Sequence, residues 1–317
     1  MNKSRIEWCD HSWNPITGCN HSCEYCYAKG ITRRFSGDVR LNMSDDRCRQ
    51  EDGIYVLDEP FATDRGIINY PFDFAPTLHN YKFDWPGKIK NGANIFVGSM
   101  TDLFGDWVPD EIINRVFEAC EKYPQHNYIF LTKNPKRYLE LEEKGFLRTG
   151  DNFWYGSSTP TPETKFFYYN KLKTFISIEP LLEPFGCEED IENTDWIIIG
   201  AETGKRKDKV KPKADWITNI VRTADIAKVP VFMKDSLIPI MGEENMRRDF
   251  PSDLCTKALS PKLKEKLYQH CGYCQETFKK SDMYAILSRE KRGASTKSVG
   301  YICKECYDTF TKGFNEN

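Results

Sequence analysis

The sequence lacks the features that mark membrane and secreted proteins. None of its apolar runs approaches the ~18 residues that a helix needs to cross a bilayer. Its first residues, MNKSRIEWCDHS, lack the apolar segment of a signal peptide, and neither low-complexity tracts nor internal repeats occur. These absences exclude a chain that spans a membrane, and they predict a cytoplasmic protein that does not act at a membrane.

A large excess of one charge is also missing. The 317 residues include 45 Lys and Arg against 47 Asp and Glu, which gives a formal net charge of −2. The two signs are nevertheless unevenly distributed. Residues 1–202 contain 22 basic and 32 acidic residues, whereas residues 203–317 contain 23 and 15. The C-terminal part is therefore the one expected to meet anions.

Hydrophobic residues make up 39 % of the chain and aromatic residues 14 %, which is enough for a hydrophobic core. Short apolar segments rich in β-branched and aromatic residues recur along the chain. They are continuous rather than alternating in polarity, as expected for strands buried on both faces of a parallel sheet. The predicted strands are residues 12–16, 94–98, 128–132, 153–156, 174–178, 196–200 and 229–233.

Helix signals lie between several of these strands. They predict helices over residues 24–35, 109–123, 135–145 and 214–228. Repeated strand–helix units imply a parallel sheet with right-handed crossovers. The sequence therefore predicts an α/β fold, a partial or complete parallel (β/α) barrel over residues 1–240, with a mostly irregular insertion at 36–93. Residues 241–317 are predicted to form a small C-terminal module that begins with a helical stretch at 260–270.

The strongest local motif is a cysteine loop after the first predicted strand. Cys19, Cys23 and Cys26 lie in the segment GCNHSCEYCY, with the spacing C-x3-C-x2-C. Three thiolates on a short loop can hold three irons of a [4Fe–4S] cluster and leave the fourth iron open to a ligand. The loop lies between a strand and a helix, which places it at the C-terminal mouth of a β/α barrel, where such folds carry their chemistry.

Two simpler interpretations of this loop stay open on the residues alone. The three cysteines could hold a structural zinc ion together with His21 or His11. Two of them could instead form a disulfide, although that bond requires an oxidising compartment.

The loop spacing, with Tyr25 before the last cysteine, resembles that of the radical S-adenosylmethionine (SAM) superfamily. Further segments resemble a narrower family of phage- and bacteria-encoded three-cysteine-motif proteins of unknown substrate, and more distantly spore photoproduct lyase, a radical SAM enzyme that repairs DNA. Many members of the narrower family have a longer gap between the first two cysteines, whereas this chain has the short superfamily spacing. The matching segments are WNPITGC (13–19), CYA (26–28), FVGSMTDLFGDWVPD (96–110), LTKNPKR (131–137), ISIEPLLEPF (176–185), WIIIGAETG (196–204) and VPVFMKD (229–235).

This resemblance implies a radical SAM barrel and its mechanism. The open iron would bind SAM, and one electron from a donor such as flavodoxin or ferredoxin would cleave it to a 5′-deoxyadenosyl radical that abstracts hydrogen from a substrate. Side chains at the strand ends should line the barrel mouth and contact the cofactor. A plainer interpretation is that Asp102 caps a turn and that Glu179 pairs with a lysine. The expected cofactor-binding residues are Tyr25, Ser99, Asp102, Ser177 and Glu179.

Basic residues near the same strand ends are candidates for substrate contact. The segment KRKDKVKPK (205–213) contains six basic residues in nine and could track phosphates, although charge runs are more often solvated loops. The candidate substrate-binding residues are Lys133, Glu202, Lys205, Arg206, Lys207, Lys209 and Lys234.

The C-terminal module carries two further cysteine pairs. Cys271 with Cys274 and Cys303 with Cys306 each form C-x2-C, and two such pairs are typical of a four-thiolate Zn²⁺ site. A second iron–sulfur cluster is the alternative. The stretch between the pairs is basic and offers Tyr284 for stacking, which favours nucleic acid, although zinc modules as often serve only to stabilise a fold. Its basic residues are Lys279, Lys280, Arg289, Lys291, Arg292 and Lys297.

Three functional hypotheses cover these observations. The first is a radical SAM enzyme that modifies or repairs a nucleic acid (DNA or RNA) or a nucleotide. The second is a radical SAM enzyme that acts on a protein or small molecule. The third is a non-catalytic iron–sulfur and zinc protein that binds nucleic acid. Cleavage of SAM separates the first two from the third.

Overall fold

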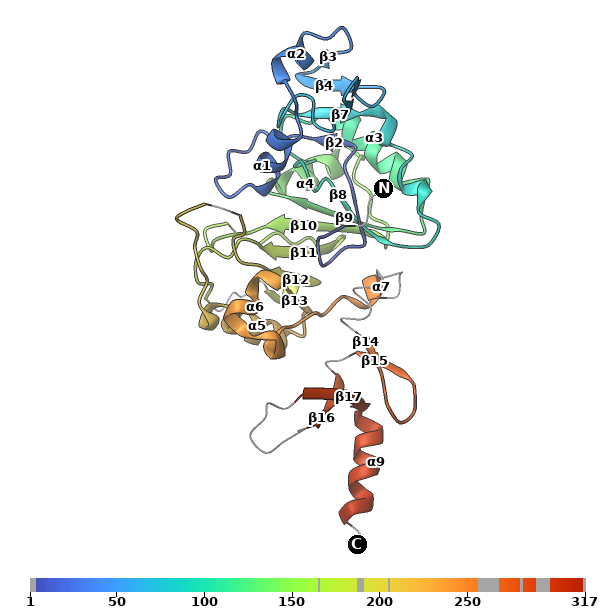
Figure 1. Cartoon of the computed structure of the whole chain (residues 1–317), viewed down its shortest axis with the longest axis vertical. Coiled ribbons are helices and arrows are strands. Elements are labelled where there is room, and N and C mark those ends of the chain that lie inside the picture. Colours follow the sequence, from blue (N-terminus) through green and yellow to red (C-terminus); the bar gives the residue numbers. More distant parts are fainter. Residues whose placement is uncertain are drawn as a thin grey trace. The chain divides into compact units, whose positions relative to one another are not determined.

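The computed structural model describes residues 4–164, 166–186, 191–204, 206–255, 268–279, 282–288 and 297–315. The chain divides into two compact units, Met1–Ala258 and Leu259–Asn317 (Figure 1). The first unit contains the three-cysteine loop, and the second contains the four C-terminal cysteines. Within the described ranges, no helix is both long and apolar enough to cross a membrane.

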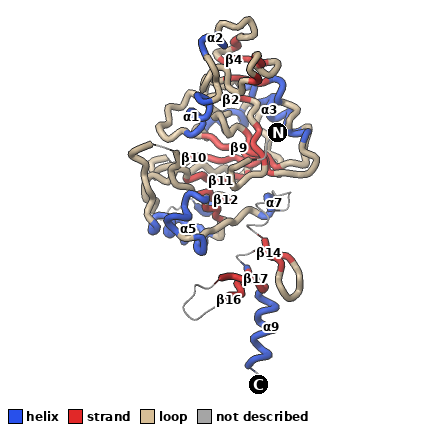
Figure 2. The backbone as a smooth tube through the Cα atoms, viewed as in Figure 1, coloured by secondary structure: helices blue, strands red, loops and turns tan. Residues whose placement is uncertain are grey.

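The first unit is built on a seven-stranded parallel sheet (Figure 2) with the strand order β1-β8-β9-β10-β11-β12-β13. Every neighbouring pair in it is parallel. Among the residues that the structure describes, the outer strands β1 and β13 do not pair with each other, so the sheet is an open half-barrel. The predicted α/β fold is confirmed. The strands are β1 (His11–Trp13), β8 (Asn94–Val97), β9 (Asn127–Thr132), β10 (Phe153–Ser158), β11 (Lys173–Ile178), β12 (Trp196–Ile199) and β13 (Val231–Met233).

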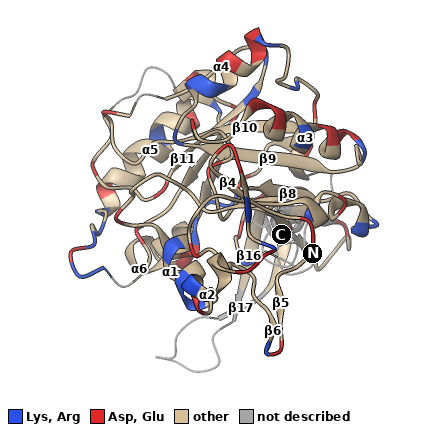
Figure 3. Ribbon diagram, turned by 90° about the horizontal axis from the view of Figure 1, so that it is seen from above, with Lys and Arg blue, Asp and Glu red and all other residues tan. Residues whose placement is uncertain are grey.

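Three amphipathic helices cover the outer face of this sheet. They are α3 (Asp110–Glu121), α4 (Lys136–Glu143) and α5 (Ala214–Ala227), close to the predicted bounds. Phe117 of α3 packs with Phe130 of β9 in one core, and Ile217 of α5 packs with the apolar residues of β11 to β13 in a second core. Figure 3 shows these helices on one side of the sheet and α1 (Tyr27–Arg34) on the other.

Aromatic side chains fill much of the inner face. The ring of Trp8 lies 4.6 Å from that of Phe96 and 6.2 Å from those of Phe175 and Trp196, measured between ring centroids. Phe250 extends the group, with its ring 5.3 Å from that of Trp196. These rings occupy the space before the strand ends, so the polar residues that follow the strands are left to face a cavity.

Residues 241–255 belong to the first unit, although the sequence placed them in the C-terminal module. Trp196 Nε1 donates a hydrogen bond to the carbonyl oxygen of Asp249 at 2.9 Å, and Asn94 Nδ2 donates to that of Leu254 at 3.3 Å. Phe250 and Leu254 are both buried. The segment therefore closes the inner face of the sheet. The segment contains η5 (Glu243–Asn245) and α7 (Ser252–Cys255). The short helices η3 (Ile191–Asn193), η4 (Asp235–Leu237) and α6 (Ile238–Met241) come before these two in the chain.

The insertion at 36–93 is more regular than the sequence predicted. It contributes to a four-stranded sheet with the order β2-β7-β4-β3 and contains a small hairpin, β5-β6. The predicted strand over residues 12–16 is also divided. β1 ends before Pro15, which has no N–H to donate to a ladder, and β2 joins β7 instead of the main sheet. The elements are β2 (Ile16–Thr17), α2 (Val39–Met43), β3 (Arg49–Glu51), β4 (Ile54–Leu57), β5 (Ala62–Thr63), β6 (Gly66–Ile67), β7 (Thr77–His79), η1 (Asn80–Lys82) and η2 (Pro86–Lys88).

The second unit consists of two antiparallel strand pairs and a helix. Strands β14 (Tyr268–His270) and β15 (Thr277–Lys279) form one pair, and β16 (Met283–Ser288) and β17 (Lys297–Cys303) form the other. Helix α9 (Lys304–Asn315) follows. The helix predicted over 260–270 is wrong at its end, where residues 268–270 are a strand, and its residues 260–267 lie outside the described ranges. Buried Cys271, Ile302 and Cys303 form the centre of a small core.

Candidate functional site

A cavity of about 360 Å³ lies at the C-terminal ends of the half-barrel strands. All three cysteines of the predicted cluster loop, Cys19, Cys23 and Cys26, line it. Side chains from the ends of six neighbouring strands line it as well, as expected for a β/α architecture. The predicted cofactor and substrate residues that border this cavity are Tyr25, Ser99, Asp102, Lys133, Ser177, Glu179, Glu202 and Lys234.

Gly18 sets the course of the chain into the cysteine loop. Its φ is +84°, and a Cβ added there would lie 2.2 Å from the carbonyl oxygen of Ala75. The N–H of Gly18 donates to the carbonyl of Met100, and the N–H of Cys19 donates to that of Phe74. The loop is therefore held between the end of β8 and the insertion, and it tolerates no side chain at this point.

Replacing Gly18 with Ala is expected to destabilise the first unit by about 2–5 kcal/mol, because left-handed backbone strain and a steric overlap add together. Gly53→Ala is the matched control, since Gly53 has a φ of +79° with no atom within 4 Å of the added Cβ. It should lose only the backbone contribution of about 1–2 kcal/mol. Chemical denaturation of both variants measures the difference, and equal losses would contradict the steric argument.

His21, between the first two cysteines, is held by Asp102. Its Nε2 lies 2.9 Å from Asp102 Oδ2, and its ring packs edge-on against Trp107 with centroids 4.9 Å apart. Asp102 also accepts hydrogen bonds from Thr132 Oγ1 at 2.7 Å and from the N–H of Lys133 at 2.9 Å. Both oxygens of this predicted cofactor ligand are thus engaged by the protein, and its carboxylate anchors the cysteine loop.

Among the described residues of the first unit, no group matches a zinc ion completed by a histidine. Within the described ranges, neither His21 nor His11 has a ring nitrogen grouped with the loop cysteines at single-ion distances. The described loop cysteines are free thiols, so they form no disulfide here.

Tyr25 and Tyr27, on either side of Cys26, bind the end of the loop to the strand ends. Lys133 Nζ donates to Tyr25 Oη at 2.9 Å and to Ser158 Oγ at 3.0 Å, and it lies 5.0 Å from the centre of the Tyr25 ring. Tyr27 Oη donates to the carbonyl of Ser99 at 2.7 Å. The loop is therefore tied to the ends of β8, β9 and β10, and the predicted substrate residue Lys133 has hydroxyl oxygens as its partners.

Arg206 links Glu24 of the cysteine loop to Glu202 at the end of β12. Its Nε and Nη2 donate to the two carboxylate oxygens of Glu202, both at 2.7 Å, and its Nη1 donates to Glu24 at 3.2 Å. The Glu202 side chain is 1 % exposed, and its hydrogen bonds to Arg206 lower its pKa. Glu24 is 81 % exposed, so its share of the contact is weak.

The other basic residues predicted to track phosphates are placed differently. Lys207 is exposed, and Lys209 Nζ donates to the carbonyl of Gly204 at 3.0 Å. Lys205 lies outside the described residues. Arg206, with two carboxylate partners, contributes no free positive charge to this segment.

Glu179 and Lys234 form an ion pair across the ends of β11 and β13. Gly200 lies beneath them, where a Cβ would come within 3.1 Å of both side chains. Burial alone would lower the pKa of Lys234, but Glu179 and Glu7 outweigh it and raise the pKa, which keeps the ammonium charged. Within the described ranges, Oε2 of Glu179 accepts no hydrogen bond, so this oxygen is available to a ligand.

Two buried polar atoms on the cavity wall have no hydrogen-bond partner among the described residues: Ser177 Oγ and Trp8 Nε1. A buried donor or acceptor without a partner costs about 1–3 kcal/mol, so such atoms mark places where a bound group is expected. Burial also raises the pKa of Cys19 to about 12. Its thiolate therefore needs a cation beside it, and an iron–sulfur cluster held by the three cysteines that line the cavity would supply one.

Residues 5–8 are the part of the site that the sequence did not reveal. Arg5, Glu7 and Trp8 line the cavity, and Glu7 Oε1 accepts a hydrogen bond from the N–H of Asp235 at 2.7 Å. They precede the first strand in an irregular segment with no periodicity. A tryptophan next to an acidic residue is the one signal in the sequence that could have indicated this part of the site.

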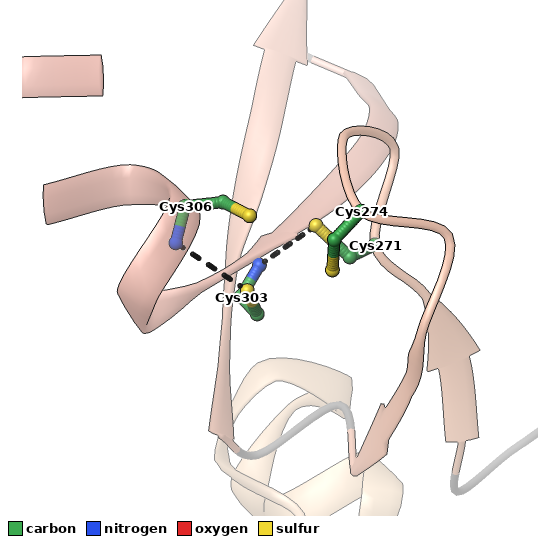
Figure 4. A group of neighbouring side chains, drawn as sticks. All are labelled: Cys271, Cys274, Cys303 and Cys306. Carbon is green, nitrogen blue, oxygen red and sulfur yellow. Dashed lines mark hydrogen bonds between the residues drawn. The ribbon is translucent and has the colours of Figure 1, made fainter. Parts of the chain in front are cut away.

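The second unit contains a separate four-cysteine group. The sulfurs of Cys271, Cys274, Cys303 and Cys306 all lie within 4.8 Å of one another, and Figure 4 shows them turned toward a common centre. A tetrahedral zinc site with Zn–S bonds of ~2.3 Å has sulfurs ~3.8 Å apart. This group therefore fits a single metal ion, whereas the cysteine sulfurs around a four-iron cluster are separated by the iron and sulfide atoms between them.

Backbone N–H groups donate hydrogen bonds to two of these sulfurs, which favours the thiolate form that binds a metal. The N–H of Cys303 donates to Cys271 Sγ and that of Cys306 donates to Cys303 Sγ, both at 3.4 Å (Figure 4). The N–H of Tyr273 also donates to Cys271 Sγ, at 3.4 Å. Burial alone would raise the pKa of Cys271, but the backbone donors outweigh it and lower the pKa to about 6. The hydrogen bond with the Cys303 side chain raises the pKa of Cys306 to about 12, since adjacent sulfurs cannot all ionise without a cation.

Comparisons with known proteins identify the family to which the chain belongs. No curated protein matches it. A solved structure of a spore photoproduct lyase mutant with bound AdoMet and dinucleoside spore photoproduct is similar, with a TM-score of 0.37, 8 % identity, and coverage of 98 % of this chain and 73 % of that one. Residues 3–237 match a family model described as "Protein of unknown function (DUF5131)". Because that match spans most of the sequence, the chain belongs to the DUF5131 family.

Proposed function

We propose that this protein is a radical SAM enzyme. The observation that carries the proposal is the convergence of Cys19, Cys23 and Cys26 on one cavity at the strand ends of a parallel half-barrel. When bound there, a [4Fe–4S] cluster would hold SAM and, given one electron from a flavodoxin or ferredoxin, cleave it to methionine and a 5′-deoxyadenosyl radical that takes hydrogen from the substrate.

The chain's own residues position the reactants. Asp102 holds the loop through His21, and Lys133 holds it through Tyr25. Glu179 Oε2 and Ser177 Oγ offer acceptors to the ammonium or ribose hydroxyls of SAM. The rings packed around Trp8 exclude water from the floor of the cavity, which protects a reactive radical.

We propose Zn²⁺ as the metal of the second unit. Four cysteine sulfurs in one small group, with backbone N–H donors to two of them, match a closed structural zinc site. No open coordination position or substrate contact is needed for this role. The ion would hold together a module whose hydrophobic core is small.

We further propose that the substrate is a nucleic acid or nucleotide. The excess of basic residues after position 202 and the basic segment between the two C-x2-C pairs support this choice. A protein or small-molecule substrate, and a non-catalytic role, are the competing hypotheses. Anaerobic incubation with SAM and reductant separates all three when release of 5′-deoxyadenosine is measured together with mass spectrometry of added DNA and RNA. Unmodified nucleic acid with 5′-deoxyadenosine indicates another substrate, and no 5′-deoxyadenosine indicates a non-catalytic role.

Reduced protein is expected to release 5′-deoxyadenosine from SAM, and Glu179→Gln is expected to weaken SAM binding about 10- to 100-fold, because a charged hydrogen bond of about 1.5–3 kcal/mol is lost. Glu183→Gln is the matched control, since Glu183 is exposed in the same segment. Iron content should be equal in both variants. If no 5′-deoxyadenosine forms while the cluster is intact, the enzymatic proposal fails; if both variants bind SAM equally, the assignment of Glu179 fails.

A further inference from the structure

The ion pairs of the first unit indicate a different basic surface from the one that the sequence suggested. Arg206 is paired with the buried carboxylate of Glu202. By contrast, four basic side chains on α1 and α2 are exposed, and none has a carboxylate within 4 Å among the described residues. Figure 3 shows Lys and Arg along both helices. These residues, here called the α1–α2 basic surface, are Lys29, Arg33, Arg34 and Arg40.

The arrangement of charges on α1 is unfavourable in the absence of an anion. Lys29 and Arg33 are four residues apart, so two like charges share one face of the helix, at a cost of about 0.2–0.5 kcal/mol. Lys29 also lies in the first turn, where the helix dipole disfavours a cation. Arg33 and Arg34 lie in the last turn, where the dipole favours them. The position of Lys29 therefore has no explanation within the helix itself.

Exposed aromatic side chains lie at both ends of α1. Tyr27, the first residue of α1, is 50 % exposed, and Phe35, directly after it, is 52 % exposed. Arginine forks bind phosphates, and aromatic faces stack on bases, so this combination suits a single-stranded nucleic acid. An acidic protein would use the charges without needing the rings.

The surface also leads to the cavity. Tyr27 lines the cavity and begins α1 directly after Cys26. A helix of eight residues spans about 12 Å, which is room for a few nucleotides of an extended strand. A strand lying on α1 would have one end at the cavity mouth, where a base could enter.

We propose that the α1–α2 basic surface is the entry path for a single-stranded nucleic acid, with phosphates on Lys29, Arg33 and Arg34 and bases stacked on Tyr27 and Phe35. This inference rests on the proposed function, because it supplies the substrate path to the same cavity. It replaces Arg206 with α1 as the part of the first unit that contacts phosphates.

The test measures binding of a fluorescein-labelled oligothymidine of about 16 nucleotides, near the upper site size of a single-strand binding fold, by anisotropy across a salt series. Arg33→Gln/Arg34→Gln should weaken binding about 10- to 100-fold at low salt and reduce the salt slope by about 1.4, for two lost phosphate contacts. The control is Arg222→Gln/Lys228→Gln, which removes two exposed charges from α5 and its end and should leave both quantities unchanged.

Several results would overturn the proposal. They are an unchanged slope in the Arg33/Arg34 variant, an equal loss in the α5 control, no oligonucleotide binding by the parent, or equally effective competition by polyglutamate, which would indicate an acidic protein partner. Release of 5′-deoxyadenosine without substrate is measured in the same samples and should be the same in the variant and the parent. Its absence, with oligonucleotide binding intact, would count against the proposed enzyme and not against the entry path.

Discussion

Replacing Cys19, Cys23 or Cys26 with Ala is expected to abolish the iron–sulfur cluster and all cleavage of SAM. Anaerobically prepared protein should contain about four irons and four sulfides on this loop, and each variant should contain close to none. The loss should be complete because three thiolates already leave one iron without a protein ligand, and two cannot hold the cube. Iron and sulfide analysis with visible absorption spectra measures the effect.

Cys48→Ala is the control for this experiment, because Cys48 is a partly buried free thiol in the insertion, away from the cavity lining. It should retain full iron. The fold of the loop variants should also persist, since Gly18, His21 and Tyr25 keep their contacts with the strand ends. A triple cysteine variant that retained its iron would refute the assignment.

The half-barrel was predictable because its strands have a distinct sequence pattern. Segments such as 128–132 and 196–200 are continuously apolar, which a strand buried on both faces requires. Parallel strands bring their C-terminal ends to one edge, so the sequence alone was enough to assign the residues after them to one mouth. The same reasoning placed the cysteine loop at that edge, where its three cysteines line the cavity.

The partners of the charged residues were not predictable. Asp102 and His21 are separated by 81 residues, and Arg206 and Glu24 by 182, so no local pattern links either pair. Which strand-end side chain meets which loop residue depends on the curvature of the sheet and the path of the loop. For this reason the sequence could propose a cofactor contact for Asp102 and a phosphate contact for Arg206, but it could not reveal that their side chains also bind the loop.

The regular structure of the insertion was missed for a different reason. Its strands are two to four residues long, below the length at which periodicity is informative. β7 pairs in parallel with β4 and antiparallel with β2, which precedes the insertion in the sequence. The sheet therefore depends on contacts between distant segments. Short strands with distant partners have no local signature, and even the four-residue IYVL segment of β4 is too short to distinguish a strand from a helical turn.

Replacing Cys303 with Ser is expected to remove the metal from the second unit and to unfold that unit. Cys303 is buried, its N–H donates to Cys271 Sγ, and its own sulfur accepts from the N–H of Cys306, so it lies at the centre of the group. Structural zinc contributes about 10–16 kcal/mol of apparent binding free energy in small zinc modules, more than a core of this size supplies. Zinc analysis should fall from about one ion per chain to none.

Hydrogen exchange distinguishes this local unfolding from loss of the whole protein. Amides in β14 to β17 and α9 should lose protection in Cys303→Ser, whereas those of the parallel sheet should keep it, because the sheet has its own extensive cores. Cys48→Ser should change neither zinc content nor protection. Protection that persists in the metal-free second unit would show that its strands are stable without the ion, and iron in place of zinc would assign the group to a rubredoxin-like centre, since four tetrahedral thiolates accept either metal.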